Sequence, residues 1–171
     1  MIRITDITEK YIPIKVTPKA IKICFDYEPF YSNDINGNKV ETNIGTWTKH
    51  TFITKKSFSQ IKEFILSEIN KRIDKKILTG FVWKEMPIWL STENQFNYKA
   101  AFDLAMQTNG NNLPTTFKFG TTENPVYYEF KTIEDLMDFY VSATTYINNC
   151  LLEGWARKDS IDWKTYEDAL K

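Results

Sequence analysis

Three stretches of the chain carry apolar residues at intervals of three and four, the spacing that places them on one face of an α-helix. The first stretch can be capped by Ser57 or Ser59, and Gly80 is a natural stop. Its apolar stripe consists of Ile61, Phe64, Ile65, Ile69, Ile73 and Ile77. We therefore expect a helix that buries one isoleucine-rich face.

The same spacing predicts two more helices. The second is expected to begin near Thr92, which has capping-box spacing to Gln95, and to end near Gly110. The third is expected to begin after Thr132, and a short tail helix is expected to begin at Asp162. The two long stripes are Tyr98, Ala101, Phe102 and Ala105, and Leu136, Phe139, Tyr140, Ala143, Ile147, Cys150 and Leu151.

The N-terminal part has the pattern of β-structure. Residues 1–20 are expected to be extended, either as an edge strand or as an arm on a neighbouring molecule, because their prolines exclude a helix. Ile21–Tyr27 and Ile44–Ile53 have the alternation of strands and are expected to pair as a hairpin. A long loop over residues 28–45 is expected at its tip, since Asn, Asp and Gly gather there.

Two further hairpins are expected between the helices. One spans Phe81–Leu90 around Lys84-Glu85, an unfavourable turn pair because neither residue favours positive φ. The other joins Thr115–Gly120 to Val126–Phe130. This order of elements predicts an α+β fold, in which small antiparallel hairpins and sheets pack with three main helices. We expect two parts, an N-terminal extended arm and β-hairpin region (1–56) and an α+β module (57–171).

Composition narrows the classes of partner. The 171 residues include 22 Lys and Arg against 22 Asp and Glu, and only three cations are Arg. No net charge draws the chain to nucleic acid or to an anionic membrane, so we expect neither partner. No apolar run could span a membrane or act as an export signal, which predicts synthesis in the cytoplasm. Aromatic residues make up 15% of the chain, and some of them suit protein contacts.

Residues with catalytic or metal-binding potential are scarce. His50 has no partner at metal-ligand spacing and is expected to be a surface or packed imidazole. Cys24 and Cys150 are expected to be buried free thiols rather than a bridge. The segment 34–38 resembles the start of a calcium loop but lacks the further acids, so a plain turn is expected. We assign no catalytic, cofactor-binding or metal-binding residue and expect no enzyme and no cofactor.

Two weaker possibilities stay open. A glycosidase would need two close carboxylates. Nothing selects one pair from the acids nearest the apolar stripes, which are Asp103, Glu129, Asp135, Asp138 and Glu153. Trp83 and Trp89, with Phe81, could form a stacking platform for sugar or single-stranded nucleic acid, although core packing is the favoured interpretation.

From about residue 81 to residue 162 the chain resembles an uncharacterised family of phage and prophage proteins, a domain of unknown function often encoded near tail-fibre genes. Such sequences are expected in phages of gut Bacteroidales. Members often carry Asn-Gly at the first hairpin turn, where Lys84-Glu85 stands here. The family brings no known activity. The resemblance rests on the segments Met86–Ser91, Asn97–Ala101, Leu113–Gly120, Pro125–Tyr127, Leu136–Tyr140 and Gly154–Asp162.

The resemblance implies a bacteriophage setting. We expect a structural or adaptor component of the virion, in the tail, tail fibre or neck, that contacts other virion proteins in a symmetric assembly. The alternatives are a tail-fibre assembly chaperone absent from the mature virion and a carbohydrate-binding or glycan-processing tail protein. Contacts are expected from the extended first 20 residues and from the 28–45 loop. The candidate contact residues are Tyr11, Ile12, Ile14, Phe30, Tyr31 and Trp47.

Overall fold

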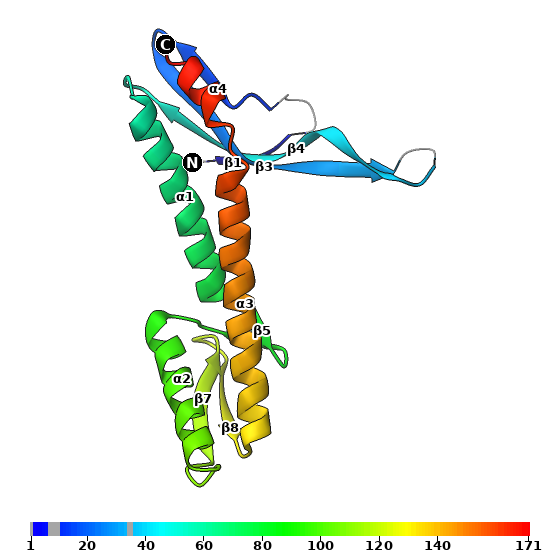
Figure 1. The fold of residues 1–171 in the computed structure, drawn as a ribbon, viewed down its shortest axis with the longest axis vertical. Helices are drawn as coiled ribbons and strands as arrows, with labels where there is room; N and C mark the ends of the chain where they lie inside the picture. The colour runs from blue at the N-terminus through cyan, green and yellow to red at the C-terminus, as the bar shows by residue number, and fades with distance from the viewer. Residues whose placement is uncertain (1, 7–10, 34–35) are drawn as a thin grey trace. The chain divides into compact units, whose positions relative to one another are not determined.

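The computed structural model describes residues 2–6, 11–33 and 36–171 (Figure 1). Helices and small antiparallel sheets alternate along this part of the chain, which confirms the predicted α+β class. The chain divides into two compact units. The first unit contains residues 1–69 and 156–171, and the second contains residues 70–155. The boundaries between these units fall inside two helices, at residues 69/70 and 155/156. The predicted division after residue 56 stays a prediction.

The first unit is built on a four-stranded antiparallel sheet with the order β1-β4-β3-β2. Its central strands are much longer than its edge strands. The edge-strand interpretation of the N-terminal segment is confirmed for β1 and β2, and residues 7–10 lie outside the described residues. The strands are β1 (Ile2–Asp6), β2 (Ile14–Thr17), β3 (Ala20–Asn33) and β4 (Lys39–Phe52).

The predicted 28–45 loop is wrong. Strand β3 continues to Asn33 and β4 begins at Lys39, so only a short connection remains, of which residues 34–35 lie outside the described part. Polar residues such as Ser32 have weak strand preference. Ladder hydrogen bonds to the opposite strand outweigh that preference here, because β propensity depends strongly on context.

The core of the first unit combines this sheet with helical residues. Helix α1 (Phe58–Thr79) begins with a reciprocal cap, in which the Gln60 amide donates to Ser57 Oγ and the Ser57 amide donates to Gln60 Oε1. The predicted tail helix is confirmed as α4 (Trp163–Asp168), capped by Asp162. The buried residues of this unit include Ile14, Ile21, Ile23, Phe25, Trp47, Ile61, Ile65, Ile69 and Tyr166.

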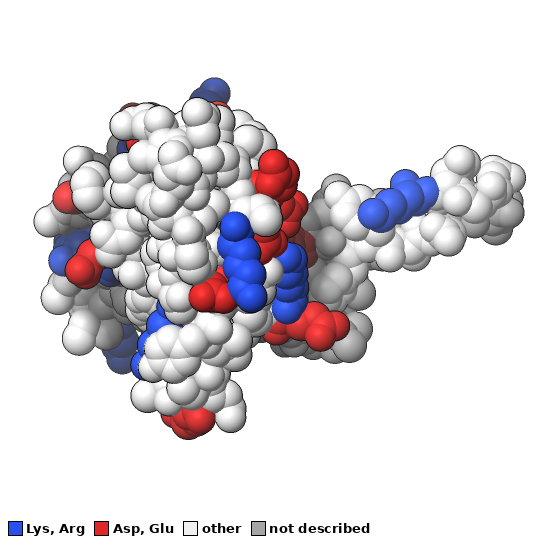
Figure 2. Space-filling model, turned by 90° about the horizontal axis from the view of Figure 1, so that it is seen from below, with Lys and Arg blue, Asp and Glu red and all other residues white. Residues whose placement is uncertain are grey.

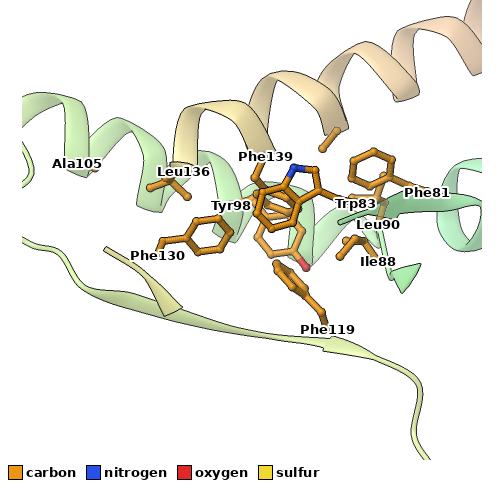
Figure 3. Packing of buried hydrophobic residues seen from close by; sticks show 11 residues of the cluster. Phe81, Trp83, Ile88, Leu90, Tyr98, Ala105, Phe119, Phe130, Leu136 and Phe139 are labelled. Atoms are coloured by element: carbon orange, nitrogen blue, oxygen red, sulfur yellow. The ribbon is translucent and has the colours of Figure 1, made fainter. Parts of the chain in front are cut away.

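The second unit encloses an aromatic core (Figure 3). The indole of Trp83 lies at its centre, stacked on Phe130 with ring centroids 5.6 Å apart and edge-on to Phe139 at 5.1 Å. Its Nε1 donates to Asp138, 2.9 Å away, so the one polar atom of the ring is satisfied. The surrounding elements are β5 (Phe81–Trp83), β6 (Met86–Ile88), α2 (Thr92–Gln107), β7 (Thr115–Gly120), β8 (Pro125–Phe130) and α3 (Ile133–Asp159).

Both predicted hairpins are confirmed, and the unfavourable first turn is present. Lys84 and Glu85 adopt φ angles of 46° and 64°, in the left-handed region. Lys84 Nζ lies 2.5 Å from Asp135 and 2.9 Å from Tyr128 Oη, and it sits over the Trp83 ring. The hydrogen bond to Asp135 raises the pKa of Lys84. Tertiary contacts therefore hold a turn that local preference disfavours.

The predicted cap of the second helix is displaced by one residue. Ser91, not Thr92, accepts the Asn94 amide at 3.2 Å. The Gln95 side chain donates to the carbonyl of Leu90 at 2.7 Å instead of closing a capping box with Thr92. Leu90 is buried, so the chain enters this helix from the core and the cap falls on the next residue.

Candidate interaction surface: the arm of the β3–β4 hairpin

The far half of the β3–β4 hairpin extends past its own sheet (Figure 1). Strand β2 pairs with β3 only up to Ile23, and β1 pairs with β4 only from Gly45 to Lys49. Beyond these positions the described residues of β3 and β4 pair with each other, ending at Asn33 opposite Lys39. We call residues 29–33 and 39–44 the arm.

The arm presents apolar and aromatic side chains to solvent. Phe30, Tyr31 and Val40 are all exposed, with Tyr31 at 51%. Lys39 Nζ lies 4.5 Å from the centroid of the Tyr31 ring, a cation–π distance. The face of the arm visible in Figure 2 is mostly uncharged, with one cationic stretch.

We call the part of the β3–β4 hairpin next to the arm (residues 25–28 and 45–47), together with the side chains packed against it, the root. The root contains a β-bulge. The register of β3 against β4 shifts between Phe25 and Glu28, and Asp26 lies in the shift with φ of 60°. A bulge of this kind bends its strand and redirects the residues beyond it. The direction of the arm is therefore set by a backbone conformation that most residues avoid.

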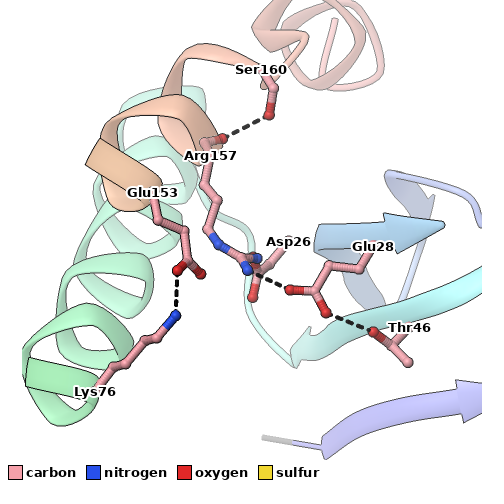
Figure 4. A network of polar contacts seen from close by, with 7 residues as sticks. All are labelled: Asp26, Glu28, Thr46, Lys76, Glu153, Arg157 and Ser160. Carbon is pink, nitrogen blue, oxygen red and sulfur yellow. Dashed lines mark hydrogen bonds and ion pairs between the residues drawn. The ribbon is translucent and has the colours of Figure 1, made fainter. Parts of the chain in front are cut away.

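An arginine from the end of α3 holds this bulge in place (Figure 4). Arg157 donates through Nη1 to Asp26 and through Nη2 to Glu28. The Asp26 side chain is only 3% exposed, and Thr46 Oγ1 donates to the second oxygen of Glu28 at 3.2 Å. Charge-assisted hydrogen bonds from one guanidinium group to two carboxylates are strong and directional, so they fix the root.

Aromatic packing and a glycine complete the root. The rings of Tyr11 and Tyr27 stack at 4.6 Å, and both lie near Trp47. A Cβ on Gly45 would lie 2.2 Å from the Glu28 carbonyl oxygen, so a side chain cannot fit between the strands there. These contacts leave the root little freedom to move.

Two tyrosine hydroxyls bind one backbone oxygen beside the bulge. Tyr11 Oη donates to the Cys24 carbonyl at 3.1 Å, and Tyr166 Oη donates to the same oxygen at 2.6 Å. Burial raises the pKa of Tyr11 to about 12 and also raises the pKa of Tyr166. Both hydroxyls therefore keep their protons at neutral pH and act as donors.

The six predicted contact residues fall into different environments. Ile12, Phe30 and Tyr31 are exposed, and Tyr11 is half-buried in the root. Ile14 and Trp47 lie in the core instead. Ile14 stands opposite the fully buried Ile23 and therefore shares its face of the sheet. Ile14 and Trp47 thus support the fold and are not available at the surface.

The sequence did not predict the contacts of Arg157 with Asp26 and Glu28 at the root. Asp26 and Glu28 lie about 130 residues from Arg157 along the chain, so no spacing rule connects them. The only signal was that Arg157 is one of three arginines in the sequence. Arginine suits a site that must bind two carboxylates at once.

The other candidates for chemistry are accounted for separately. His50 packs its ring against Phe52 and Phe64, and both cysteines are buried with no disulfide between them. Each of the five carboxylates singled out from the sequence binds its own partner or pair of partners. Asp103 binds Lys99, Glu129 binds Lys131, Asp135 binds Lys84 and Tyr128, Asp138 binds Trp83 and Glu153 binds Lys76 (Figure 4).

Within the described residues, no three His, Cys, Asp or Glu side chains are placed to share a metal ion. None of the helices in that part of the chain has the length and apolar character needed to cross a lipid bilayer. No protein-family model, no curated protein and no solved structure matches the chain.

Proposed function

We propose that this chain is a structural adaptor of a bacteriophage particle and that it docks on another virion protein through the arm. The observation that carries the proposal is the arm itself, a projecting hairpin that exposes Phe30, Tyr31 and Val40 on a root fixed by Arg157. The phage setting comes from the sequence resemblance over residues 81–162.

A fixed root favours binding for an energetic reason. Immobilising a flexible segment costs conformational entropy, which lowers the affinity of any contact that it makes. Here Asp26, Glu28 and Gly45 already hold the hairpin in one direction. The free energy of burying Phe30 and Tyr31 is therefore available for affinity.

The backbone of the arm offers a second means of binding. An extended hairpin can add a strand to the sheet of a partner through main-chain hydrogen bonds, while side chains on alternate positions provide specificity. The register of β3 against β4 shifts between Pro29 and Tyr31, so Phe30 lies in an irregular part of the strand directly before Tyr31. A partner that covers this segment would bury both rings.

Mass spectrometry of purified phage particles tests this function. We expect the wild-type chain in the particles, and we expect loss of the Phe30→Ser/Tyr31→Ser variant from particles although it remains in the lysate. Ile53→Ser is the matched control, because Ile53 is an exposed apolar residue of the same unit outside the arm. Wild-type protein that is abundant in infected cells but absent from particles would favour the assembly chaperone instead.

A further inference from the structure

The second unit displays an exposed tryptophan that the fold places outside the core. Trp89 comes directly after β6, between Ile88 and Leu90, which are both 1% exposed. Side chains alternate in direction along extended backbone, so two buried neighbours force the middle residue outward. The Trp89 side chain is 53% exposed, and a large apolar ring is therefore held in water.

This indole borders a groove of about 440 Å³. The volume falls within the range of small-molecule sites, roughly 300–1,000 Å³. Besides Trp89, the apolar residues Pro87, Ile88 and Phe119 line the groove, and exposed polar residues make up half of the lining. Those polar residues are Thr79, Lys118, Thr121, Thr122 and Glu123.

Both walls of the groove have a fixed backbone. On one side, Asn94 Nδ2 donates to the Trp89 carbonyl at 2.8 Å, and the Leu90 amide donates to the Leu78 carbonyl at 3.1 Å. On the other side, the Asn124 amide donates to Thr121 Oγ1 at 3.1 Å. The backbone that carries Trp89 and Thr121 is therefore fixed before any ligand arrives, which lowers the cost of binding.

We propose that this groove binds a neutral saccharide. A sugar ring has one face of C–H groups, which can cover the apolar indole, and a rim of hydroxyls, which need donors and acceptors. Thr121 and Thr122 offer both, while Lys118 donates and Glu123 accepts. The charges of Lys118 and Glu123 balance, so the groove favours an uncharged ligand over a phosphate or an ammonium group.

The same lining favours binding over cleavage. Glycoside hydrolysis commonly uses two carboxyl groups on opposite sides of the bond. Glu123 is the single carboxylate among the described residues that line this groove. We therefore infer a glycan-binding site and no hydrolysis at this position.

Saturation-transfer NMR at millimolar disaccharide concentration tests the site. The probes are maltose, lactose, cellobiose and N,N′-diacetylchitobiose. We expect signals from at least one of them, and we expect Trp89→Ala to weaken its affinity about tenfold or more, since stacking on an aromatic ring contributes strongly. Trp155→Ala is the matched control, because Trp155 is 54% exposed in the same unit but does not line the groove.

A second variant, Glu123→Gln, keeps the test valid if Trp89→Ala does not fold. Glu123 is exposed, so its substitution should leave the fold intact. It should also weaken binding while the melting temperature is unchanged. The absence of signals from all four sugars, or an equal loss in Trp155→Ala, would overturn the proposal. The arm variant Phe30→Ser/Tyr31→Ser should bind sugar like the wild type, so failure here is separable from failure of the adaptor function.

Discussion

His50 illustrates how one side chain can make stability depend on pH. Its ring packs against Phe52 and Phe64, with centroid distances of 4.5 Å and 4.4 Å. Burial is the main cause that lowers its pKa below the ordinary 6.5, and Glu68 partly opposes the shift. Since His50 is the only histidine in the sequence, its titration can be removed by one substitution.

We expect the wild type to lose more stability than His50→Gln when the pH falls from above 6.5 to below the folded pKa. Between the two pKa values the unfolded chain binds more protons, so the free energy of unfolding rises with pH there. The contribution is complete above pH 6.5 and is lost as the pH falls through the folded pKa. Urea denaturation at several pH values measures the free energy of unfolding of both proteins. Identical pH profiles for the wild type and His50→Gln would contradict the prediction.

Glu85 allows a second prediction at this scale. Its φ of 64° strains a residue that carries a Cβ, and glycine removes that strain. We expect Glu85→Gly to raise the free energy of unfolding by about 0.5–1 kcal/mol, since the left-handed conformation costs roughly 1–2 kcal/mol and glycine loses part of the gain through entropy. Glu85→Ala keeps the strain and serves as control. Equal stability of the Gly and Ala variants in urea denaturation would disprove this origin.

At the level of elements, the spacing of apolar residues was sufficient to predict a helix and its buried face wherever a segment buries one face. The Ile61, Ile65, Ile69 and Ile73 stripe of α1 is buried as predicted, because helical spacing alone determines which residues share a face. Periodicity failed for the arm, whose described apolar side chains are exposed. The sequence of residues 28–45 then carries no burial signal, and cross-strand pairing decides the structure.

The root of the arm gives a prediction at this scale. Arg157→Met removes the cation that this arginine supplies to the buried Asp26, and breaking a buried pair in this way costs about 3–5 kcal/mol. We expect hydrogen exchange to show that loss in the amides of β3 and β4. The double variant Arg157→Met/Asp26→Asn also removes the buried negative charge and should recover part of the loss. A double variant that is less stable by the sum of both single effects would contradict this coupling.

For the whole molecule, the sequence predicts the class of fold and most elements but not how distant segments meet. Arg157 and Tyr166 belong to the first unit because of contacts with Asp26, Glu28 and Cys24, more than 100 residues away. Such contacts depend on the complete fold, so local patterns cannot reveal them. The exposure of Trp89 follows from the burial of Ile88 and Leu90 on either side of it, and that burial is likewise a property of the complete fold.

The division into two units leads to the last prediction. Trp47 is 1% exposed in the first unit, and Trp83 is 5% exposed in the second. Replacing a buried tryptophan by alanine costs about 3–5 kcal/mol through lost burial and a cavity. If each unit opens as its own cooperative segment, that cost appears only in the unit that carries the substitution.

Native-state hydrogen exchange measures the two units separately, with the β3–β4 amides as reporters of the first and the β7–β8 amides as reporters of the second. We expect Trp47→Ala to lower the opening free energy of the β3–β4 amides and to leave the β7–β8 amides nearly unchanged. Trp83→Ala should have the reverse effect. Each variant is therefore the control for the other. An equal decrease in both sets of amides would show that the chain unfolds as one cooperative body, and the two compact units would then be a feature of packing without independent stability.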